Sequence, residues 1–174
     1  MSLIMDLKEE GNDDLSILLN FSSVENNYIY RSGFPHPSNF AFLKSLNLRS
    51  IICLCPEPYP EEHMEFLRIN NINLYQFGLD GTKDPSTMSS RSEIIMSALR
   101  VIIDERNYPV LLHCNRGKHR TGCVVGCLRK LQNWCLDAVV EEYKHFAGAK
   151  WRENDIKFLE GFDVQILFEY FSYL

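Results

Sequence analysis

The alternation of apolar and polar positions along the chain predicts strands that alternate with helices. Four short segments are continuously apolar or rich in β-branched residues, as buried strands are, and they lie at 24–31, 48–54, 72–77 and 108–112. Apolar residues at helical spacing predict helices at 38–46, 61–70, 92–106, 121–133, 135–147 and 153–170. This order favours an α/β fold with a mostly parallel central sheet and helices on both faces.

The start of the chain lacks this periodicity and is acidic. We therefore expect a loosely ordered N-terminal arm at 1–20 and a single domain at 21–174. A chain of 174 residues is long enough to bury a sizeable core without disulfides.

Net charge and cysteine usage limit the expected class of protein and its cellular compartment. A formal net charge of −5 argues against a general nucleic-acid binder, and no apolar run approaches membrane-spanning length. We expect the six cysteines to be reduced thiols of a cytoplasmic protein, with entry into the nucleus left open. The Cys53-x-Cys55 motif lacks a second pair or histidines at metal spacing, so no metal site is expected.

The most informative stretch lies between the last predicted strand and the helix after it. Residues 113–122 read His-Cys-Asn-Arg-Gly-Lys-His-Arg-Thr-Gly. A strand, a tight loop and a helix start are typical of an anion-binding loop, because backbone N–H groups and the helix dipole converge there. Four basic-type side chains lie between Cys114 and Thr121, namely Arg116, Lys118, His119 and Arg120. This local positive charge in an acidic chain indicates a small, highly charged ligand.

Two residues of this stretch suggest nucleophilic chemistry. Cys114 would lie at the base of the loop, where amides and the helix dipole favour a reactive thiolate that can attack phosphorus. Arg120 would hold two phosphate oxygens in its planar fork. Thr121 is expected to cap the following helix and to donate its hydroxyl to the sulfur as it leaves. The alternative interpretation is a buried structural cysteine beside an unrelated basic turn.

The same stretch resembles the signature of the cysteine-dependent protein tyrosine phosphatase superfamily. The longer string at 114–130 is similar to the plant and fungal atypical dual-specificity phosphatases, and further matches lie at 29–35, 54–60 and 76–78. The resemblance covers about residues 20–163. It implies a three-layer tyrosine phosphatase-like fold with about four to five strands. Two mild departures are Asn115, where many members have lysine, and Asp80, where glutamate is expected.

The resemblance also implies a function. It indicates a phosphatase that needs no cofactor, forms a phosphocysteine and removes the β-phosphate of inositol pyrophosphates such as 5-diphosphoinositol polyphosphates. The alternatives are a dual-specificity or tyrosine protein phosphatase acting on phosphoproteins, a phosphoinositide phosphatase, or a non-catalytic phosphate-binding adaptor. An intact Cys114, Arg120 and Thr121 count against the adaptor.

A general acid is expected from the polar loop at 78–85. Asp80 lies nearer the strand end and is favoured over Asp84, although it could instead cap a turn. His119 is a third candidate, because it could either assist proton transfer or bind charge. The residues expected to bind phosphate are Asn115, Arg116, Gly117, Lys118, His119, Arg120 and Lys83. A solvated side chain is the simpler interpretation of Lys83.

Four further residues receive structural interpretations. His113 is expected to orient the loop through backbone hydrogen bonds, and Arg31 to anchor strand ends in an ion pair. Cys53 or Cys55 could form a disulfide with Cys114 under oxidation, although buried packing is favoured.

Overall fold

The computed structural model describes residues 18–80 and 88–172. Five short strands form one sheet, and they are β1 (Ser22–Glu25), β2 (Ile29–Ser32), β3 (Ser50–Cys53), β4 (Asn73–Gln76) and β5 (Val110–His113). Their order is β1-β2-β5-β3-β4. Only β1 pairs antiparallel to its neighbour, whereas the pairs of β2, β3, β4 and β5 are all parallel. The expectation of a mostly parallel sheet is confirmed.

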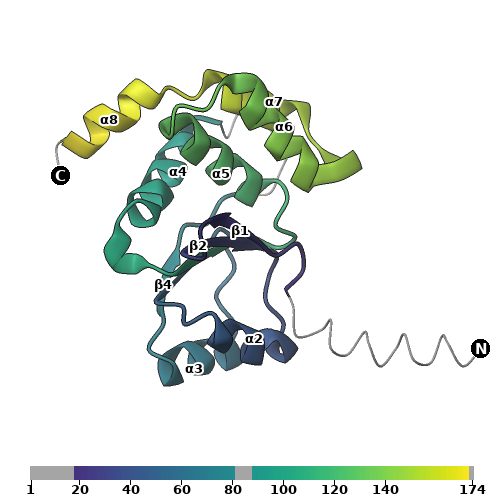
Figure 1. Cartoon of the computed structure of the whole chain (residues 1–174), viewed down its shortest axis with the longest axis vertical. Helices are drawn as coiled ribbons and strands as arrows, with labels where there is room; N and C mark the ends of the chain where they lie inside the picture. The colour runs from purple at the N-terminus through teal and green to yellow at the C-terminus, as the bar shows by residue number, and fades with distance from the viewer. Residues whose placement is uncertain (1–17, 81–87, 173–174) are drawn as a thin grey trace, which may run out of the picture.

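Helices cover both faces of this sheet. They are α2 (Phe40–Ser45), α3 (Glu61–Ile69), α4 (Met88–Ile102), α5 (Arg120–Leu131), α6 (Leu136–Ala147), α7 (Glu153–Gly161) and α8 (Val164–Ser172). Short 3₁₀ turns accompany them in the described part of the chain, η1 (Pro37–Asn39), η3 (Glu105–Asn107) and η4 (Gly148–Lys150). Figure 1 shows α2 and α3 beneath the sheet and α4 to α7 above it. Among the described helices, none is both long and apolar enough to cross a membrane.

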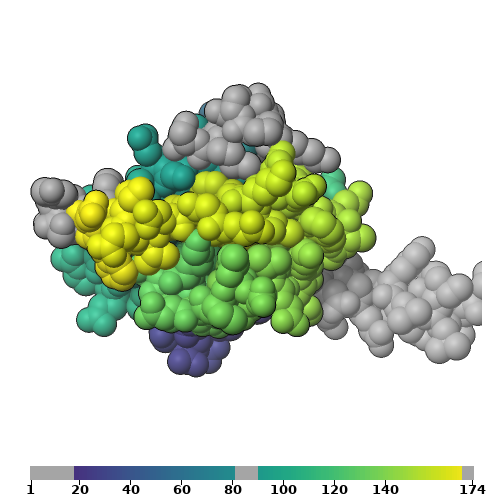
Figure 2. Space-filling view, turned by 90° about the horizontal axis from the view of Figure 1, so that it is seen from above, coloured from purple at the N-terminus to yellow at the C-terminus, as the bar shows by residue number. Residues whose placement is uncertain are grey.

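The core follows from the central position of β5. Every residue of this strand is buried, because β2 and β3 flank it on both sides and helices cover both faces. Ile51, Ile52, Leu111 and Leu112 have no exposed surface. On the upper face, α5 packs against α4, α6, α7 and α8. Seen from that side, the green and yellow helices form a continuous outer layer (Figure 2).

Two predicted elements are each divided in the structure. The strand expected at 24–31 is a hairpin of β1 and β2, because Asn26 and Asn27 turn the chain with φ angles of 34° and 64°. Asparagine tolerates this left-handed region better than most residues. The helix expected at 153–170 is interrupted at Phe162, whose ψ of 120° leaves the helical region. Asp163 Oδ1 then accepts a hydrogen bond from the Gln165 N–H at 2.8 Å and starts α8.

Other boundaries also differ from the expectation. The helix predicted at 92–106 begins earlier, at Met88, and ends at Ile102 before the turn η3. Packing begins before residue 21, because Leu18 is buried and the Leu19 carbonyl accepts a hydrogen bond from the Gly33 N–H at 2.8 Å. The rest of the predicted arm, residues 1–17, lies outside the described residues.

Candidate active site

Residues 114–119, which we call the cradle loop, connect the end of β5 to the start of α5. Since β5 is the central strand, the loop emerges at the middle of the sheet edge where the parallel strands end. Cys114 is its first residue and is only 3% exposed. Its Sγ accepts a hydrogen bond from the Gly117 N–H at 3.2 Å. At least this amide of the loop therefore points inward at the thiol, as an anion-binding loop requires.

Gly117 is required by the shape of the loop. Its φ is 75°, in the left-handed region that favours glycine. A Cβ at this position would lie 2.6 Å from the carbonyl carbon of Ser32 on the neighbouring strand. The loop can therefore pack onto β2 only with glycine at this position.

Three donors behind the loop hold its carbonyl groups away from the thiol. The Asn115 carbonyl accepts from the Phe34 N–H at 2.8 Å, and the Arg116 carbonyl from Asn20 Nδ2 at 2.7 Å. The Gly117 carbonyl accepts from Arg31 Nη2 at 3.1 Å. Consecutive carbonyls that point backwards leave the amides to face the opposite side, towards a bound anion.

Arg31 therefore supports the cradle loop, and its predicted ion pair is not found among the described residues. Its side chain is 1% exposed and forms no salt bridge with any residue that the structure describes. The guanidinium instead lies 3.7 Å from the centre of the Phe146 ring. Burial lowers the pKa of Arg31 to about 10, so the side chain remains a cation at neutral pH. Sequence reasoning also missed Asn20 and Phe34 as supports of the loop.

His113 orients the start of the loop, as predicted. The ring is fully buried, and burial lowers the pKa of His113 to about 4, so the neutral form prevails at neutral pH. The Cys114 carbonyl lies 3.1 Å from Nδ1, which must be the protonated nitrogen because a carbonyl only accepts. Nε2 then accepts from the Tyr59 hydroxyl at 3.0 Å. Burial raises the pKa of Tyr59, so this hydroxyl keeps its proton.

A pocket of about 360 Å³ opens in front of Cys114. The residues that line it are Cys114, Asn115, Arg116, Lys118, His119, Arg120, Lys150 and Arg152. It therefore brings together every candidate of the cradle loop except the buried Gly117. Five of these described lining residues are Lys or Arg, and none of them is Asp or Glu. Such a surface attracts a ligand with several negative charges.

Lys150 and Arg152 come from the segment 150–152 between α6 and α7, which we call the basic wall. Sequence reasoning did not assign them to the site. The available signal was two basic residues two positions apart, just after Gly148, whose φ of 59° ends α6. Nothing local in the sequence places this turn beside residue 118, because only the packing of α6 on α5 does so.

His119 connects the cradle loop to the basic wall. Its Nε2 donates to the Lys150 carbonyl at 2.7 Å. The pKa of His119 is lowered, mainly by burial, and the charges of Arg152 and Lys118 act in the same direction. A neutral ring whose Nε2 proton is already bound to a carbonyl is poorly suited to protonate a leaving group. This geometry favours a role of the neutral His119 ring in positioning the basic wall over a role as the general acid.

Thr121 does not take its predicted role as a helix cap. Helix α5 begins at Arg120 with His119 at the N-cap position, so Thr121 lies inside the first turn and caps nothing. Its Oγ1 is buried and has no hydrogen-bond partner among the described residues. The expected donation to the Cys114 sulfur as it leaves stays a prediction.

The general-acid candidates lie at the border of the described residues. Asp80 is exposed and follows Leu79, whose carbonyl lies 3.5 Å from Arg120 Nη1. The Asp80 side chain lines a small hollow beside Arg91, not the pocket in front of Cys114. Lys83 and Asp84 lie outside the described residues. The choice between Asp80 and Asp84 stays a prediction.

The two cysteines of β3 and the following loop lie near the site but are not joined to it. All six cysteines are free, and Cys53 and Cys55 are buried. The pKa of Cys55 is lowered to about 7 by a hydrogen bond from Cys53, with a further contribution from the charge of Arg120.

Comparison with known proteins places this geometry in a family. The model of the tyrosine phosphatase family matches residues 16–171. The inositol diphosphatase DSP3 of Arabidopsis thaliana is 55% identical over 99% of this chain and 88% of its own length. A probable tyrosine-protein phosphatase of Dictyostelium discoideum is 43% identical over 86% of this chain and 89% of its own length.

A solved structure agrees with these relatives. The core catalytic domain of the PP-IP phosphatase SIW14 from Saccharomyces cerevisiae, in complex with citrate, superposes with a TM-score of 0.80. It is 44% identical, and the match covers 90% of this chain and 93% of that one. The family model and the relatives each span most of the chain and include the cradle loop. The chain belongs to the tyrosine phosphatase family.

Proposed function

We propose that this protein hydrolyses the β-phosphate of inositol pyrophosphates through a phosphocysteine on Cys114. The observation that carries the proposal is the lining of the pocket, where a thiol at the base is surrounded by five Lys or Arg side chains. A phosphotyrosine side chain carries one phosphate, whereas an inositol pyrophosphate presents several around one small ring. The names of the relatives in Arabidopsis thaliana and yeast support the same substrate class.

In the first step, the β-phosphate lies against the inward-facing amides of the cradle loop, and Arg120 binds its oxygens. The Cys114 thiolate attacks phosphorus in line with the P–O bond to the inner phosphate. That bond breaks, and its electron pair leaves on the oxygen of the inositol phosphate. This oxygen is already a weak base, so the step needs less help from an acid than the hydrolysis of an alkyl ester does.

In the second step, water attacks the phosphocysteine. The P–S bond breaks, its electron pair returns to sulfur, and inorganic phosphate leaves. The proton of the water passes to a carboxylate of the predicted acid loop at 78–85, where the sequence favours Asp80 over Asp84. Arg116, Lys118, Lys150 and Arg152 meanwhile bind the phosphates that do not react.

A tyrosine-protein phosphatase is the second candidate, because one relative carries that name. Initial rates on 5-diphosphoinositol pentakisphosphate, a phosphotyrosine peptide and a phosphoinositide, measured at equal ionic strength, separate the two. We expect kcat/KM to be highest for the diphosphoinositol compound. A higher kcat/KM for the peptide would contradict the proposal and favour the second candidate.

A further inference from the structure

Behind the basic wall, three helices meet in one buried network of polar groups. Tyr143 of α6 is 1% exposed, Asp155 of α7 is 2% exposed and Arg91 of α4 is 5% exposed. The Tyr143 hydroxyl donates to Asp155 Oδ2 at 2.5 Å, and Arg91 Nη1 donates to Asp155 Oδ1 at 2.8 Å. The Tyr143 oxygen also accepts from the backbone N–H of Arg152 at 3.2 Å. The network therefore ends on the main chain of a pocket residue.

Burial and packing fix the Tyr143 hydroxyl as a donor to Asp155 and an acceptor from Arg152. Burial raises the pKa of Tyr143, so the group keeps the proton that it donates to Asp155. The ring is also fixed, because a Cβ on Gly122 in the first turns of α5 would lie only 2.8 Å from Tyr143 Cδ1. The position of the oxygen is thus set by packing against α5, independently of the wall that it contacts.

The basic wall is bound at two further points. His119 Nε2 donates to the Lys150 carbonyl at 2.7 Å. The ammonium of Lys144 lies 4.3 Å from the centre of the Trp151 ring. The main chain on each side of Trp151 is therefore held, at Lys150 by the cradle loop and at Arg152 by Tyr143.

Repulsion between like charges explains why the basic wall needs these attachments. Lys150 and Arg152 line the same pocket as Arg116, Lys118 and Arg120, and like charges that share a pocket repel one another. Without a bound anion, this repulsion pushes the wall away from the cradle loop. Neutral hydrogen bonds to the main chain oppose it without reducing the positive charge that the substrate meets. A carboxylate inside the pocket would hold the wall equally well, but it would compete with phosphate.

We propose that the Tyr143 hydroxyl is a positioning group that holds the basic wall against the pocket, so that Lys150 and Arg152 reach the substrate phosphates that do not react. The inference rests on the proposed polyphosphate substrate. Arg91 and Asp155 complete the support by fixing the direction of the Tyr143 O–H bond. Arg91 also lines the small hollow beside Asp80, so the same network joins both borders of the site.

The test is Tyr143→Phe, which keeps the ring against Gly122 and removes only the hydroxyl. One lost buried hydrogen bond is expected to raise KM for 5-diphosphoinositol pentakisphosphate about fivefold. The ratio of kcat/KM for this substrate to kcat/KM for p-nitrophenyl phosphate is expected to fall by a similar factor, because the small monoester does not reach the wall. Combined with Lys150→Ala/Arg152→Ala, Tyr143→Phe should add little further loss, since the side chains that it positions are gone.

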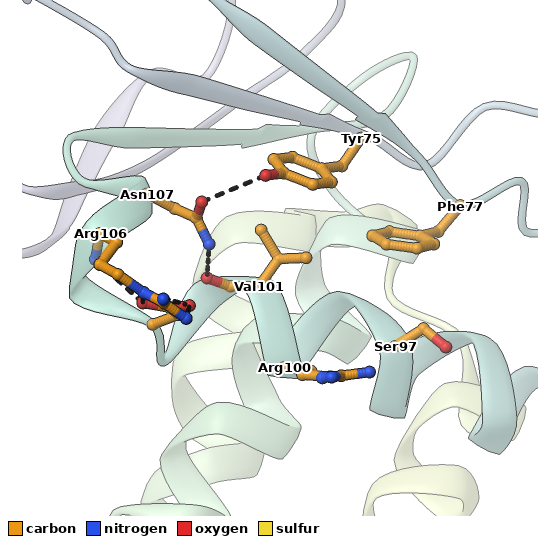
Figure 3. A pocket seen from close by; sticks show the side chains of 8 residues that line it. Tyr75, Phe77, Ser97, Arg100, Val101, Arg106 and Asn107 are labelled. Carbon is orange, nitrogen blue, oxygen red and sulfur yellow. Dashed lines mark hydrogen bonds and ion pairs between the residues drawn. The ribbon is translucent and has the colours of Figure 1, made fainter. Parts of the chain in front are cut away.

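The matched control is Tyr75→Phe. Tyr75 also loses one hydrogen bond, to Asn107 Oδ1 at 3.2 Å, but it faces a different pocket on α4 (Figure 3). Its substrate ratio should stay at the wild-type value. Asp155→Asn is a second variant that disturbs the same hydroxyl, and thermal melting shows whether each variant is folded.

The outcomes separate the two proposals. An unchanged substrate ratio in Tyr143→Phe, or an equal loss on both substrates, overturns the positioning role of Tyr143. If wild-type protein shows no preference for the diphosphoinositol compound over p-nitrophenyl phosphate or the phosphotyrosine peptide, the proposed function fails before any variant is compared. A fallen ratio in Tyr143→Phe and Asp155→Asn, with Tyr75→Phe unchanged, supports the inference.

Discussion

Two pockets of this protein differ in volume and in the charged residues that line them. The larger one, of about 590 Å³, lies beside the edge strand β4 and α4 and is lined in part by Tyr75, Phe77 and Arg100 (Figure 3). The pocket in front of Cys114 measures only about 360 Å³. Volume alone therefore does not identify the pocket that contains Cys114.

In the larger pocket, most polar groups bind one another. The Arg106 guanidinium donates to both carboxylate oxygens of Asp104. Asn107 accepts from the Tyr75 hydroxyl and donates to the Val101 carbonyl at 2.9 Å. In the smaller pocket, five Lys or Arg side chains lie around the Cys114 thiol, and none of the described residues that line it is Asp or Glu. The comparison shows that positive charge gathered around a nucleophile identifies the site better than volume does.

The largest expected effect is that of Cys114→Ser. Removing the nucleophile should lower kcat at least about 10³-fold on every substrate, because the variant has no thiolate positioned to attack phosphorus. Initial rates with p-nitrophenyl phosphate and with 5-diphosphoinositol pentakisphosphate measure it. Cys135→Ser, at an exposed thiol before α6, is the control and should retain full activity. Activity above one tenth of wild type in Cys114→Ser would exclude the phosphocysteine mechanism.

The next largest effect is expected in the pH dependence of stability, through the buried His113 ring behind the cradle loop. The folded pKa of His113 is about 4, well below the ordinary value of 6.5, so the unfolded chain binds more protons below pH 6.5. The free energy of unfolding should fall as pH drops from 6.5 to 4, by about 3 kcal/mol from this group.

Urea titrations at several pH values measure this slope. His113→Asn, whose amide does not titrate, should show a flatter dependence than wild type over the same range. Equal slopes in the two proteins would mean that the ring takes up no proton on unfolding.

A smaller effect is expected when the basic wall loses its charges. Lys150→Ala/Arg152→Ala should raise KM for 5-diphosphoinositol pentakisphosphate about 10- to 100-fold, as expected for the loss of charge-assisted hydrogen bonds. The salt dependence of kcat/KM should weaken, because fewer cations attract the substrate. An unchanged KM would show that the substrate does not reach the wall.

The smallest effect is expected at the larger pocket. Arg100 is exposed and carries a positive charge like Lys150, so Arg100→Ala is matched to the preceding variant. Its kcat/KM should stay within about twofold of wild type on both substrates, and its unfolding free energy within about 0.5 kcal/mol. A rise in KM above about fivefold would connect the larger pocket to turnover and erase the contrast between the two.

The sequence predicted the centre of the site because its parts are adjacent in the chain. A buried strand, a glycine-containing basic loop and a helix start follow one another within 108–122, and connectivity alone brings Cys114 and Arg120 together. Boundaries were less predictable. The Asn26-Asn27 turn and the break at Phe162 lie inside apolar patterns that continue on both sides, so periodicity did not reveal them.

By itself, the sequence determined the order of strands and helices, the nucleophile and its cradle, since each depends on contacts within a few residues. Only the tertiary structure decided what supports and encloses the cradle. Arg31 lies 86 positions from Gly117, and Asn20 lies 96 positions from Arg116. Lys150 lies 31 positions after His119, whose ring donates to its carbonyl. Such contacts depend on how β2 pairs with β5 and how α6 packs on α5, and no local pattern of residues encodes that packing.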